Sequence, residues 1–406
     1  MIGQVSKKYL FINKALSGTG GARVILNLAV SLINHGHSVS ILIDRKDNID
    51  YEIDPRINIY LRKKRKIIKI NSSNRDNIYP RELKPNFKRK IAPQKLIMYI
   101  KRVISIVNFL NFYLEKKTYN SFIEKNNFDI VVNNNIYSNL ERILFEKSEN
   151  LAYFVNFHNS PNEVFSRKDF FSIIPLHKIF SNVNLLAVSN GAKDELQNIS
   201  FLSKNRKKTI YNPFDFNQII EKANNTRSDN IDDYIILVAS LTQRKRIDRA
   251  LNAMKYITES YSDIKLLILG CGNLQYQLEE FVNKNNLDRN VMFLGFQENP
   301  YQYIYNAKLL MLTSDSEGLP TVLIESLILG TPVISTNCPT GPKEILEPWG
   351  DECLINLSDN ENRIIEEIAD KSIKLLKKNY SKEYIISKSN LGRFESETIV
   401  SQWEKL

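Results

Sequence analysis

The chain has 406 residues, of which 43% are hydrophobic, and its formal net charge is +11. A chain of this length predicts two domains of about 200 residues, each able to bury its own core. Three cysteines, Cys271, Cys338 and Cys353, form neither an even disulfide framework nor a metal-ligand spacing, which argues against a secreted disulfide scaffold. Since Met1–Lys8 is polar and a short apolar run follows it, we expect no signal peptide and a cytoplasmic protein.

An α/β pattern opens the chain. A buried strand, a glycine loop, an amphipathic helix and a second strand are predicted at Tyr9–Asn13, 17–22, Arg23–Asn34 and Val39–Ile43. This order is typical of a doubly wound α/β domain that binds a ligand at the carboxyl end of its first strand. Gly20 and Gly21 are therefore candidate ligand-binding residues. Their spacing is not G-x-G-x-x-G, so a nicotinamide cofactor is the weaker interpretation, and Asp44 is interpreted as an ordinary strand-end residue.

One segment makes the protein basic. Residues 62–102 contain fifteen Lys or Arg against Asp76 and Glu82, which gives 15 − 2 = +13, compared with +11 for the whole chain. Prolines interrupt residues 62–93 and no periodicity appears there, so we interpret them as a mobile basic insertion. Such a segment suits nucleic acid, an anionic membrane or a phosphate-rich substrate.

A long helix or helical pair is predicted over Lys95–Lys125. Its apolar seam consists of Leu96, Ile100, Val103, Val107, Leu110 and Leu114. The uncharged run Val103–Leu114 has twelve residues and is too short to span a bilayer. Two interpretations remain open: a helix that packs on the core, and an interfacial helix that lies on a membrane beside the basic segment.

A histidine follows one of the next strands. Phe128–Val132 and Leu151–Phe157 are predicted strands, and His158 comes directly after the second. Since ligands bind at the carboxyl ends of strands in open α/β sheets, this position favours a functional role for His158. The other histidines, His35, His37 and His177, are interpreted as structural.

We place the domain boundary at a polar stretch before Tyr234. The predicted divisions are a first domain, a linker, a second domain and a C-terminal helix, at 1–212, 213–233, 234–388 and 389–406. The second domain opens with a strand, Ile235–Ser240, and continues into a loop that contains Arg244, Lys245 and Arg246. A cationic loop between a strand and a helix suits a diphosphate, although a solvated charge run is the alternative.

The stretch Ser314–Leu346 organises the second domain. Gly318 and Pro320 place Glu317 in a loop, and the apolar run Val322–Leu329 predicts a helix that carries Glu325. A strand is expected at Val333–Thr336, and a Gly-Pro turn at residues 341–345 should lead into another helix. Two helix N-termini in one region would hold phosphate, while the carboxylates accept hydrogen bonds from sugar hydroxyls.

These residues resemble a known signature. The pattern E-G-x-P-x-x-x-x-E, followed by G-x-P-V-I, is similar to the donor site of the retaining family 4 glycosyltransferases. The resemblance implies the GT-B fold, in which two doubly wound Rossmann-like domains face each other across a cleft and a C-terminal helix crosses back to the first domain. It also implies transfer of a sugar from a nucleotide diphosphate to an acceptor hydroxyl, with retention and without a further cofactor.

The resemblance assigns roles residue by residue. It implies that Glu317 binds hydroxyls of the donor sugar, that Glu325 binds the ribose, and that Gly318, Leu319 and Pro320 form the turn between them. His158 matches the strand-end histidine that approaches the donor sugar, and the loop at Phe296 matches the one that holds the base through backbone atoms.

The resemblance also has a gap. Lys245 matches the family lysine that faces the leaving diphosphate, but Ser240 stands where the family has an arginine. Arg244 or Arg246 would have to supply that charge, and Gly20 and Gly21 would lie beside the diphosphate and the acceptor.

We expect a UDP-sugar donor, a glycan or polyprenyl-diphosphate-linked acceptor, and attachment to the inner face of the cell membrane. No Asp-x-Asp triplet occurs, so we expect no metal. Two other functions stay open: a sugar-nucleotide 2-epimerase of the same fold, and a polyanion-binding protein that uses residues 62–102. Against a polyanion-binding protein, residues 62–102 lack the recognition motifs of nucleic-acid-binding modules.

Overall fold

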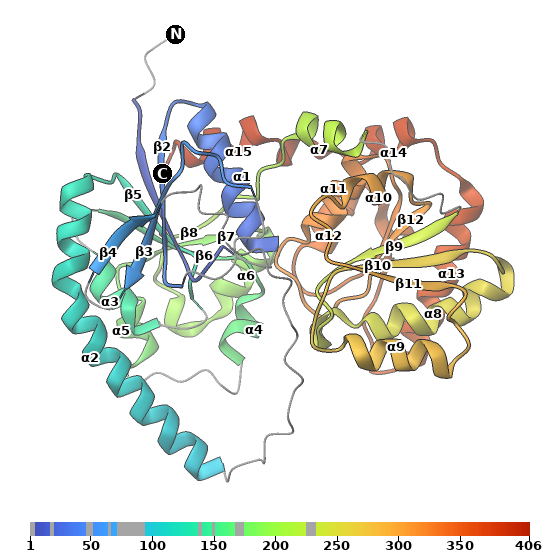
Figure 1. Cartoon of the computed structure of the whole chain (residues 1–406), viewed down its shortest axis with the longest axis horizontal. Coiled ribbons are helices and arrows are strands. Elements are labelled where there is room, and N and C mark those ends of the chain that lie inside the picture. The colour runs from blue at the N-terminus through green and yellow to red at the C-terminus, as the bar shows by residue number, and fades with distance from the viewer. Residues whose placement is uncertain are drawn as a thin grey trace. The chain divides into compact units, whose positions relative to one another are not determined.

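The computed structural model describes residues 5–16, 20–45, 52–63, 66–70, 94–136, 140–147, 151–166, 174–224 and 233–406, with the backbone alone at 94–102, 105 and 108. The chain divides into two compact units, which Figure 1 colours by residue number. The first is Met1–Pro213 with Ser396–Leu406, and the second is Phe214–Glu395. The C-terminal segment thus joins the first unit from Ser396 on, seven residues later than the predicted start at 389.

The described residues of the first unit form an eight-stranded sheet in the order β4-β3-β2-β1-β5-β6-β7-β8. Neighbouring strands are parallel except for the antiparallel pair β3 and β4. The strands are β1 (Lys8–Asn13), β2 (Ser38–Ile43), β3 (Asn58–Lys63), β4 (Lys66–Ile70), β5 (Ile130–Asn133), β6 (Ala152–Phe157), β7 (Asn184–Ala187) and β8 (Lys207–Thr209). The strand order reverses direction between β1 and β5, the place where doubly wound sheets bind ligands.

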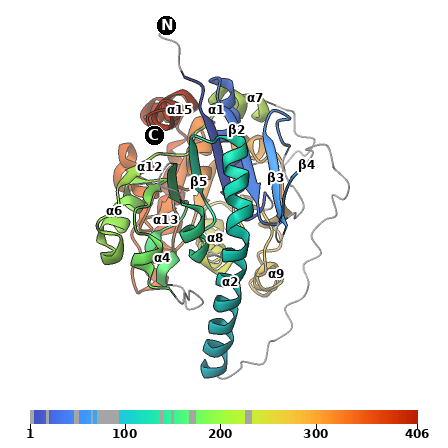
Figure 2. The ribbon, with the colours of Figure 1, turned by 90° about the vertical axis from the view of Figure 1, so that its left-hand side faces the viewer.

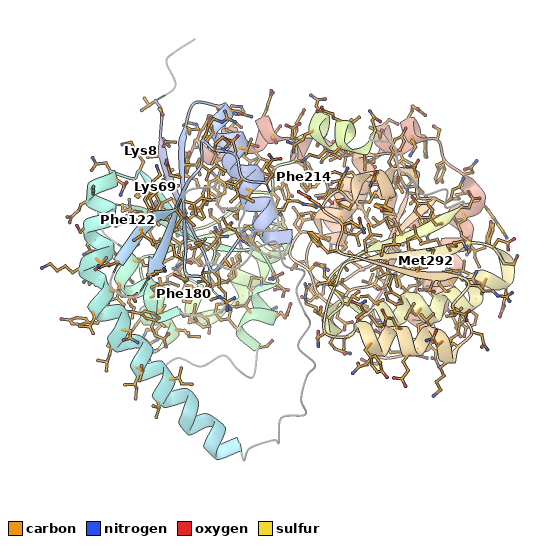
Figure 3. The ribbon with its side chains drawn as sticks, in the orientation of Figure 1. Lys8, Lys69, Phe122, Phe180, Phe214 and Met292 are labelled. Carbon is orange, nitrogen blue, oxygen red and sulfur yellow. The ribbon has the colours of Figure 1, made fainter. Side chains whose placement is uncertain are left out.

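Helices cover both faces of this sheet (Figures 1 and 2). They are α1 (Gly20–Asn34), α2 (Gln94–Asn126), α3 (Ile143–Glu146), α4 (Pro161–Ser166), α5 (Leu176–Ile179), α6 (Asn190–Asn198) and α15 (Ser396–Trp403), with the 3-10 turns η1 (Leu140–Arg142) and η2 (Ser200–Leu202). Alternate side chains of β1 enter different cores, as the pleat requires. Tyr9 and Phe11 pack with α1 and with Trp403 of α15, whereas Leu10 and Ile12 belong to a core that contains Phe180, labelled in Figure 3.

The structure corrects the prediction of a mobile insertion at 62–93. Arg62 lies in β3 and is only 8% exposed, because its guanidinium donates to Glu146 Oε1 at 2.7 Å. Residues 66–70 form β4, whose two lysines and three isoleucines pair with β3. Residues 64–65 and 71–93 lie outside the described part of the chain.

The predicted long helix is confirmed as α2, and of the two open interpretations the one that packs its apolar seam on the core is wrong for the described part of the seam. Val103, Val107, Leu110 and Leu114 are 43%, 50%, 54% and 50% exposed. Figure 2 shows α2 crossing one face of the first unit and continuing beyond the end of the sheet. The spacing found the apolar side of the helix but could not show which side meets the core.

The second unit has a six-stranded sheet among the described residues, in the order β11-β10-β9-β12-β13-β14 and parallel throughout. Its strands are β9 (Tyr234–Val238), β10 (Lys265–Leu269), β11 (Val291–Gly295), β12 (Leu309–Leu312), β13 (Val333–Thr336) and β14 (Leu354–Ile355). This is the strand order of the first unit without its two edge strands, the antiparallel β4 and the parallel β8. The change of direction lies between β9 and β12, which places a ligand site at the loops that follow these two strands. We call this place in each sheet, between β1 and β5 in the first unit and between β9 and β12 in the second, its switch point.

The helices of this unit are α7 (Phe216–Ala223), α8 (Ile247–Ser260), α9 (Gln275–Lys284), α10 (Tyr301–Asn306), α11 (Thr321–Ile328), α12 (Pro342–Ile345), α13 (Glu361–Lys378) and α14 (Lys382–Lys388), with 3-10 turns η3 (Gln243–Lys245), η4 (Glu347–Glu352) and η5 (Leu391–Phe394). Helix α7 packs against α10 and α11, so residues 214–224 belong to this unit and not to a linker. Residues 225–232 of the predicted linker lie outside the described chain.

Candidate active site

The loops after β9 and β12 meet at the switch point of the second unit. Asp315 N donates to Arg244 O at 2.9 Å, and Thr313 Oγ1 donates to Arg246 O at 2.9 Å. The loop after β10 supports them from the other side, since a Cβ on Gly272 would lie 2.2 Å from Leu241 O. Only glycine permits this backbone-to-backbone approach. The position of the cationic loop is therefore fixed by main-chain contacts on two sides.

Glu317 lies at the centre of the site and gathers three donors. Its Oε1 accepts from Lys245 Nζ at 2.5 Å and from Ser314 Oγ at 2.6 Å. Its Oε2 lies 3.2 Å from Arg244 Nη1. Glu317 is only 6% exposed, while the side chains of Lys245 and Arg244 are 15% and 28% exposed. A buried carboxylate thus holds two cations that remain accessible from solution.

The charges of this cluster fix the ionisation of Glu317. Burial raises the pKa of the Glu317 carboxyl, but Lys245, Arg244 and the hydrogen bond from Ser314 outweigh burial and hold the pKa below its usual value. The carboxylate is therefore ionised at neutral pH and acts as a counter-ion.

The turn after Glu317 is shaped by a second glycine. Gly341 has φ +91°, and a Cβ there would lie 2.5 Å from Pro320 Cδ and 2.8 Å from Gly318 O. Thr340 Oγ1 donates to the carbonyl oxygen of Glu317 and ties the two loops together. The close approach explains why a glycine-proline turn follows β13.

The predicted elements of this stretch are largely confirmed. Helix α11 and strand β13 lie where the sequence places them, and the turn from Gly318 through Leu319 to Pro320 is buried at the start of α11. The prediction of two helix N-termini needs correction, because α12 is a single turn of four residues and has a correspondingly small dipole. Glu325 is in the second turn of α11 and is 3% exposed.

Arg246 does not join the cluster around Glu317. It adopts a left-handed backbone with φ 45°, and its guanidinium donates to Asp248 Oδ2 at 2.9 Å and Glu361 Oε2 at 2.8 Å. Arg249 completes this second network by donating to Glu361 Oε1 at 2.7 Å. Of the two arginines that could replace the missing charge at Ser240, the structure favours Arg244.

Two further predicted ligand-binding side chains are accessible in the same unit. Ser240 is exposed in the loop that follows β9, and Phe296 is 47% exposed after β11. Cys338 is buried nearby, and burial raises the pKa of its thiol to about 12, which agrees with a structural role. In the described chain, no group of three or more His, Cys, Asp or Glu side chains is placed to hold a metal ion.

The first unit carries a different set of groups at its own switch point. His158 Nε2 lies 2.9 Å from Asn134 Oδ1 and 3.1 Å from Asn156 Nδ2. Asn134 Nδ2 in turn donates to Asn13 Oδ1 at 3.1 Å, which links the ends of β1, β5 and β6. Burial lowers the pKa of His158 to about 4, so its imidazole is neutral at pH 7.

The remaining predicted residues of the first unit lie at the start of α1. Gly20 and Gly21 are its first two residues and are exposed, while residues 17–19 of the glycine loop lie outside the described chain. Asp44 is not available to a ribose, because its Oδ2 accepts from Arg142 Nη1 and from Asn135 Nδ2, each at 2.7 Å.

Sequence reasoning missed the roles of Ser314, Asn13 and Asn156. The signal for the two asparagines was present, since each interrupts an otherwise apolar strand near its carboxyl end.

Comparison with known proteins agrees with this geometry. Residues 218–390 match the family described as Glycosyl transferases group 1. An uncharacterised glycosyltransferase of Methanocaldococcus jannaschii is 28% identical over 370 residues, which cover 79% of this chain and 90% of that protein. The chain is therefore similar to glycosyltransferases, and its fold is the GT-B fold.

Other similar proteins match the chain over a shorter length. A Campylobacter jejuni N-acetylgalactosaminyltransferase that acts on a diphospho-undecaprenol-linked sugar is 27% identical over 222 residues, which cover 52% of this chain and 58% of that protein. Among solved structures, the pneumococcal O-GlcNAc transferase GtfA in complex with UDP and GlcNAc has a TM-score of 0.67 at 14% identity, covering 98% of each chain. At that identity the structural likeness concerns the fold alone.

Proposed function

We propose that the enzyme transfers a hexosyl or N-acetylhexosaminyl group from a UDP-sugar to a hydroxyl of a lipid-linked or polymeric glycan, with retention and without a metal ion. The observation that carries this proposal is the cluster of Lys245, Arg244 and Glu317 at the switch point of the second unit. Retention is supported by the likeness of the Glu317–Glu325 signature to the retaining family 4 enzymes.

The proposed chemistry follows from the charges of the cluster. Transfer breaks the bond between the anomeric carbon and a β-phosphate oxygen, and negative charge develops on the departing UDP. Lys245 and Arg244 offer two accessible cations on a fixed loop, and preorganised charges of this kind stabilise a leaving group without costly reorganisation. The anomeric carbon then forms its new bond to the acceptor oxygen, whose proton leaves to the released diphosphate or to water. Two cations can supply the charge that a metal ion supplies elsewhere.

Glu317 fits a role toward the sugar. Its carboxylate is ionised and buried, and it sits between the two cations that would face the diphosphate. Once a diphosphate takes over these cations, the carboxylate oxygens are free to accept hydrogen bonds from hydroxyls of the attached sugar. Glu325, on the adjoining helix, is proposed to bind the ribose.

The acceptor is proposed to bind to the first unit, where Gly20, Gly21 and His158 lie at the carboxyl edge of the sheet. Relatives that act on diphospho-undecaprenol-linked sugars support an acceptor at a membrane surface. Because Arg62 is buried, the charge available to a membrane is that of residues 63–102, which hold fourteen Lys or Arg against two acidic residues, 14 − 2 = +12. This charge suits an anionic bilayer, where each Lys or Arg near the surface contributes about 1 kcal/mol. We propose that the enzyme works as a peripheral protein on the cytoplasmic face. The described chain holds no helix that is long and apolar enough to cross a membrane.

Calorimetry and turnover test this proposal. UDP should bind the intact enzyme and GDP should bind more weakly, and a panel of UDP-sugars with a polyprenyl-diphosphate-linked acceptor should release UDP together with a glycosylated lipid. Formation of a UDP-linked epimer without an acceptor would instead show an epimerase. Salt-sensitive binding to RNA in the absence of any UDP binding would show a polyanion-binding protein.

A further inference from the structure

The outward face of α2 is apolar over one defined stretch. Fifteen large hydrophobic side chains are exposed among the described residues, and seven of them fall within residues 103–114. They are Val103, Ile104, Ile106, Val107, Leu110, Tyr113 and Leu114, with exposures of 43%, 53%, 42%, 50%, 54%, 62% and 50%. On a helix with 3.6 residues per turn these positions cover about half of the circumference. We call this set the α2 face.

The α2 face ends abruptly within the same helix. From residue 115 onward the exposed positions are polar: Lys116, Lys117, Asn120, Ser121, Glu124 and Lys125. A contiguous exposed apolar surface of this size marks an interaction site in a soluble protein, while single exposed side chains are ordinary. The change from apolar to polar exposed residues at position 115 therefore marks where the interaction site on α2 ends.

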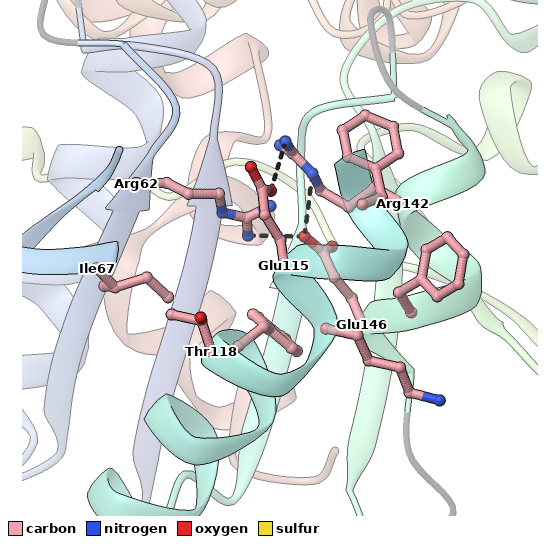
Figure 4. Close-up of a pocket in the computed structure, with 10 residues that line it drawn as sticks. Arg62, Ile67, Glu115, Thr118, Arg142 and Glu146 are labelled. Atoms are coloured by element: carbon pink, nitrogen blue, oxygen red, sulfur yellow. Dashed lines mark hydrogen bonds and ion pairs between the residues drawn. The ribbon is translucent and has the colours of Figure 1, made fainter. Parts of the chain in front are cut away.

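The opposite side of α2 is held to the first unit, so the helix cannot rotate to bury this face. Phe112 and Tyr119 are 5% exposed, and Glu115 enters a charged cluster at the small pocket drawn in Figure 4. In that cluster Arg142 Nη2 lies 3.5 Å from Glu115 Oε2, and its guanidinium carbon lies 4.4 Å from the centre of the Phe112 ring.

The same cluster reaches the sheet through Glu146, which accepts from Arg62 of β3 at 2.7 Å. Breaking a buried ion pair of this kind by removing one partner is strongly destabilising. The anchor thus fixes the orientation in which α2 presents its apolar face.

The charge around the α2 face indicates whether a second copy of the chain or a membrane covers it. Residues 94–114 of α2 contain Lys95, Lys101 and Arg102 and no Asp or Glu. A second copy of the chain would bring these positive charges against their equivalents, and like charges brought together oppose association. An anionic bilayer offers the opposite charge together with an apolar interior. A wide apolar face flanked by basic residues, with a tyrosine among its side chains, is the pattern of helices that lie in a membrane interface.

We propose that the α2 face inserts into the headgroup and acyl boundary of an anionic membrane and positions the first unit on it. This rests on the proposed membrane attachment of the enzyme and assigns the attachment to particular residues. The apolar face supplies insertion, and the basic residues that precede it in α2 supply attraction to the surface.

Flotation with vesicles tests the proposal. The parent enzyme should float with vesicles of equal phosphatidylglycerol and phosphatidylcholine, and less with phosphatidylcholine alone. The variant Val103→Ser/Val107→Ser/Leu110→Ser should bind the anionic vesicles at least about tenfold more weakly. A matched control, Ile220→Ser/Tyr256→Ser/Ile386→Ser, removes side chains of similar exposure, 43%, 43% and 44%, from the second unit and should bind as the parent does.

Two outcomes would overturn the membrane proposal. One is equal vesicle binding by the α2 variant and the parent. The other is a concentration-dependent dimer of the parent that the α2 variant abolishes while neither protein binds vesicles. UDP binding by calorimetry, expected to be unchanged in both variants, verifies folding. If the parent enzyme does not bind UDP, that result counts against the proposed donor site and not against membrane binding.

A second variant keeps the test decisive if the triple variant does not fold. Leu110→Trp should be quenched by brominated lipids in anionic vesicles, whereas Trp349 and Trp403 are 5% and 2% exposed and should not respond. Quenching of Leu110→Trp no greater than that of the parent would also refute insertion.

Discussion

Replacing Glu317 by glutamine should tighten the binding of free UDP while it slows sugar transfer. In the unliganded enzyme the carboxylate holds Lys245 at 2.5 Å and Arg244 at 3.2 Å, and these are the two cations proposed for the diphosphate. A bound diphosphate must therefore compete with Glu317. The neutral amide of Glu317→Gln keeps the shape of the side chain and removes the competing charge.

The size of the effect follows from these two contacts. Hydrogen bonds that involve a charged group contribute about 1.5–3 kcal/mol each, and UDP has to loosen two of them. If half of one such contact is recovered in the variant, UDP binding tightens by about 0.75–1.5 kcal/mol, or roughly three- to thirteenfold. The pair is largely buried, so salt should screen the effect only weakly.

Transfer should change in the opposite direction. The sugar of the donor loses a carboxylate acceptor in Glu317→Gln, and an interaction made with the reacting sugar is worth about a hundredfold or more in turnover when it strengthens in the transition state. The same substitution is thus expected to improve the binding of the product nucleotide and to impair the reaction.

Calorimetry with UDP and with an intact UDP-sugar separates the two effects, and UDP release measures turnover. Glu347→Gln, an exposed carboxylate of the same unit, serves as the control for loss of one negative charge. If Glu317→Gln weakens UDP and the UDP-sugar to the same extent, Glu317 is not a counter-ion that the donor displaces, and the reasoning fails.

Three other substitutions test the assignment of individual groups. Lys245→Ala should lower turnover by about a hundredfold or more with the fold intact. Arg246→Ala should lower turnover far less, because Arg246 is held by Asp248 and Glu361. The kinetics of UDP release compare the two variants. Glu325→Gln should weaken UDP and UDP-sugar equally in calorimetry, since the ribose is common to both, and an effect confined to the intact UDP-sugar would reassign Glu325 to the sugar. His158 has a folded pKa of about 4 against 6.5 when unfolded, so the free energy of unfolding should fall as the pH drops from 6.5 to 4, by up to about 1.4 kcal/mol per pH unit. His158→Gln should flatten that fall in urea denaturation at pH 7 and pH 5, and an unchanged slope would remove His158 as its cause.

Much of the donor site could be predicted from the sequence because its signals are local. Gly318, Pro320 and Gly330 mark the turn and the end of α11, and the apolar run between them defines the helix. Strand β13 follows as predicted for the same reason. The contact between Lys245 and Glu317 was not predictable from spacing alone, since 72 residues separate them and only the adjacency of β9 and β12 brings their loops together.

The missed features depend on which surface is covered. Strand β4 escaped notice because a run of lysines resembles a solvated segment, while its isoleucines pair with β3. The seam of α2 has the spacing of a core helix, but Phe112 and Tyr119 on the opposite side are the buried residues, and Tyr119 packs in the core beneath the sheet. Periodicity reports that a helix has an apolar side, and only the tertiary structure shows whether that side is buried.

The two switch points carry different chemistry on the same strand order. The second unit presents cations and a carboxylate, which suits a ligand with a diphosphate. The first presents a network of Asn13, Asn134, Asn156 and a neutral His158, and Asn156 Oδ1 is buried with no hydrogen-bond partner in the described chain. A buried acceptor without a donor costs free energy unless a ligand or water satisfies it, and a sugar hydroxyl can donate to it. Uncharged hydrogen-bonding groups select a hydroxyl over a phosphate. The difference in charge between the two edges therefore supports diphosphate recognition by the second unit and hydroxyl recognition by the first.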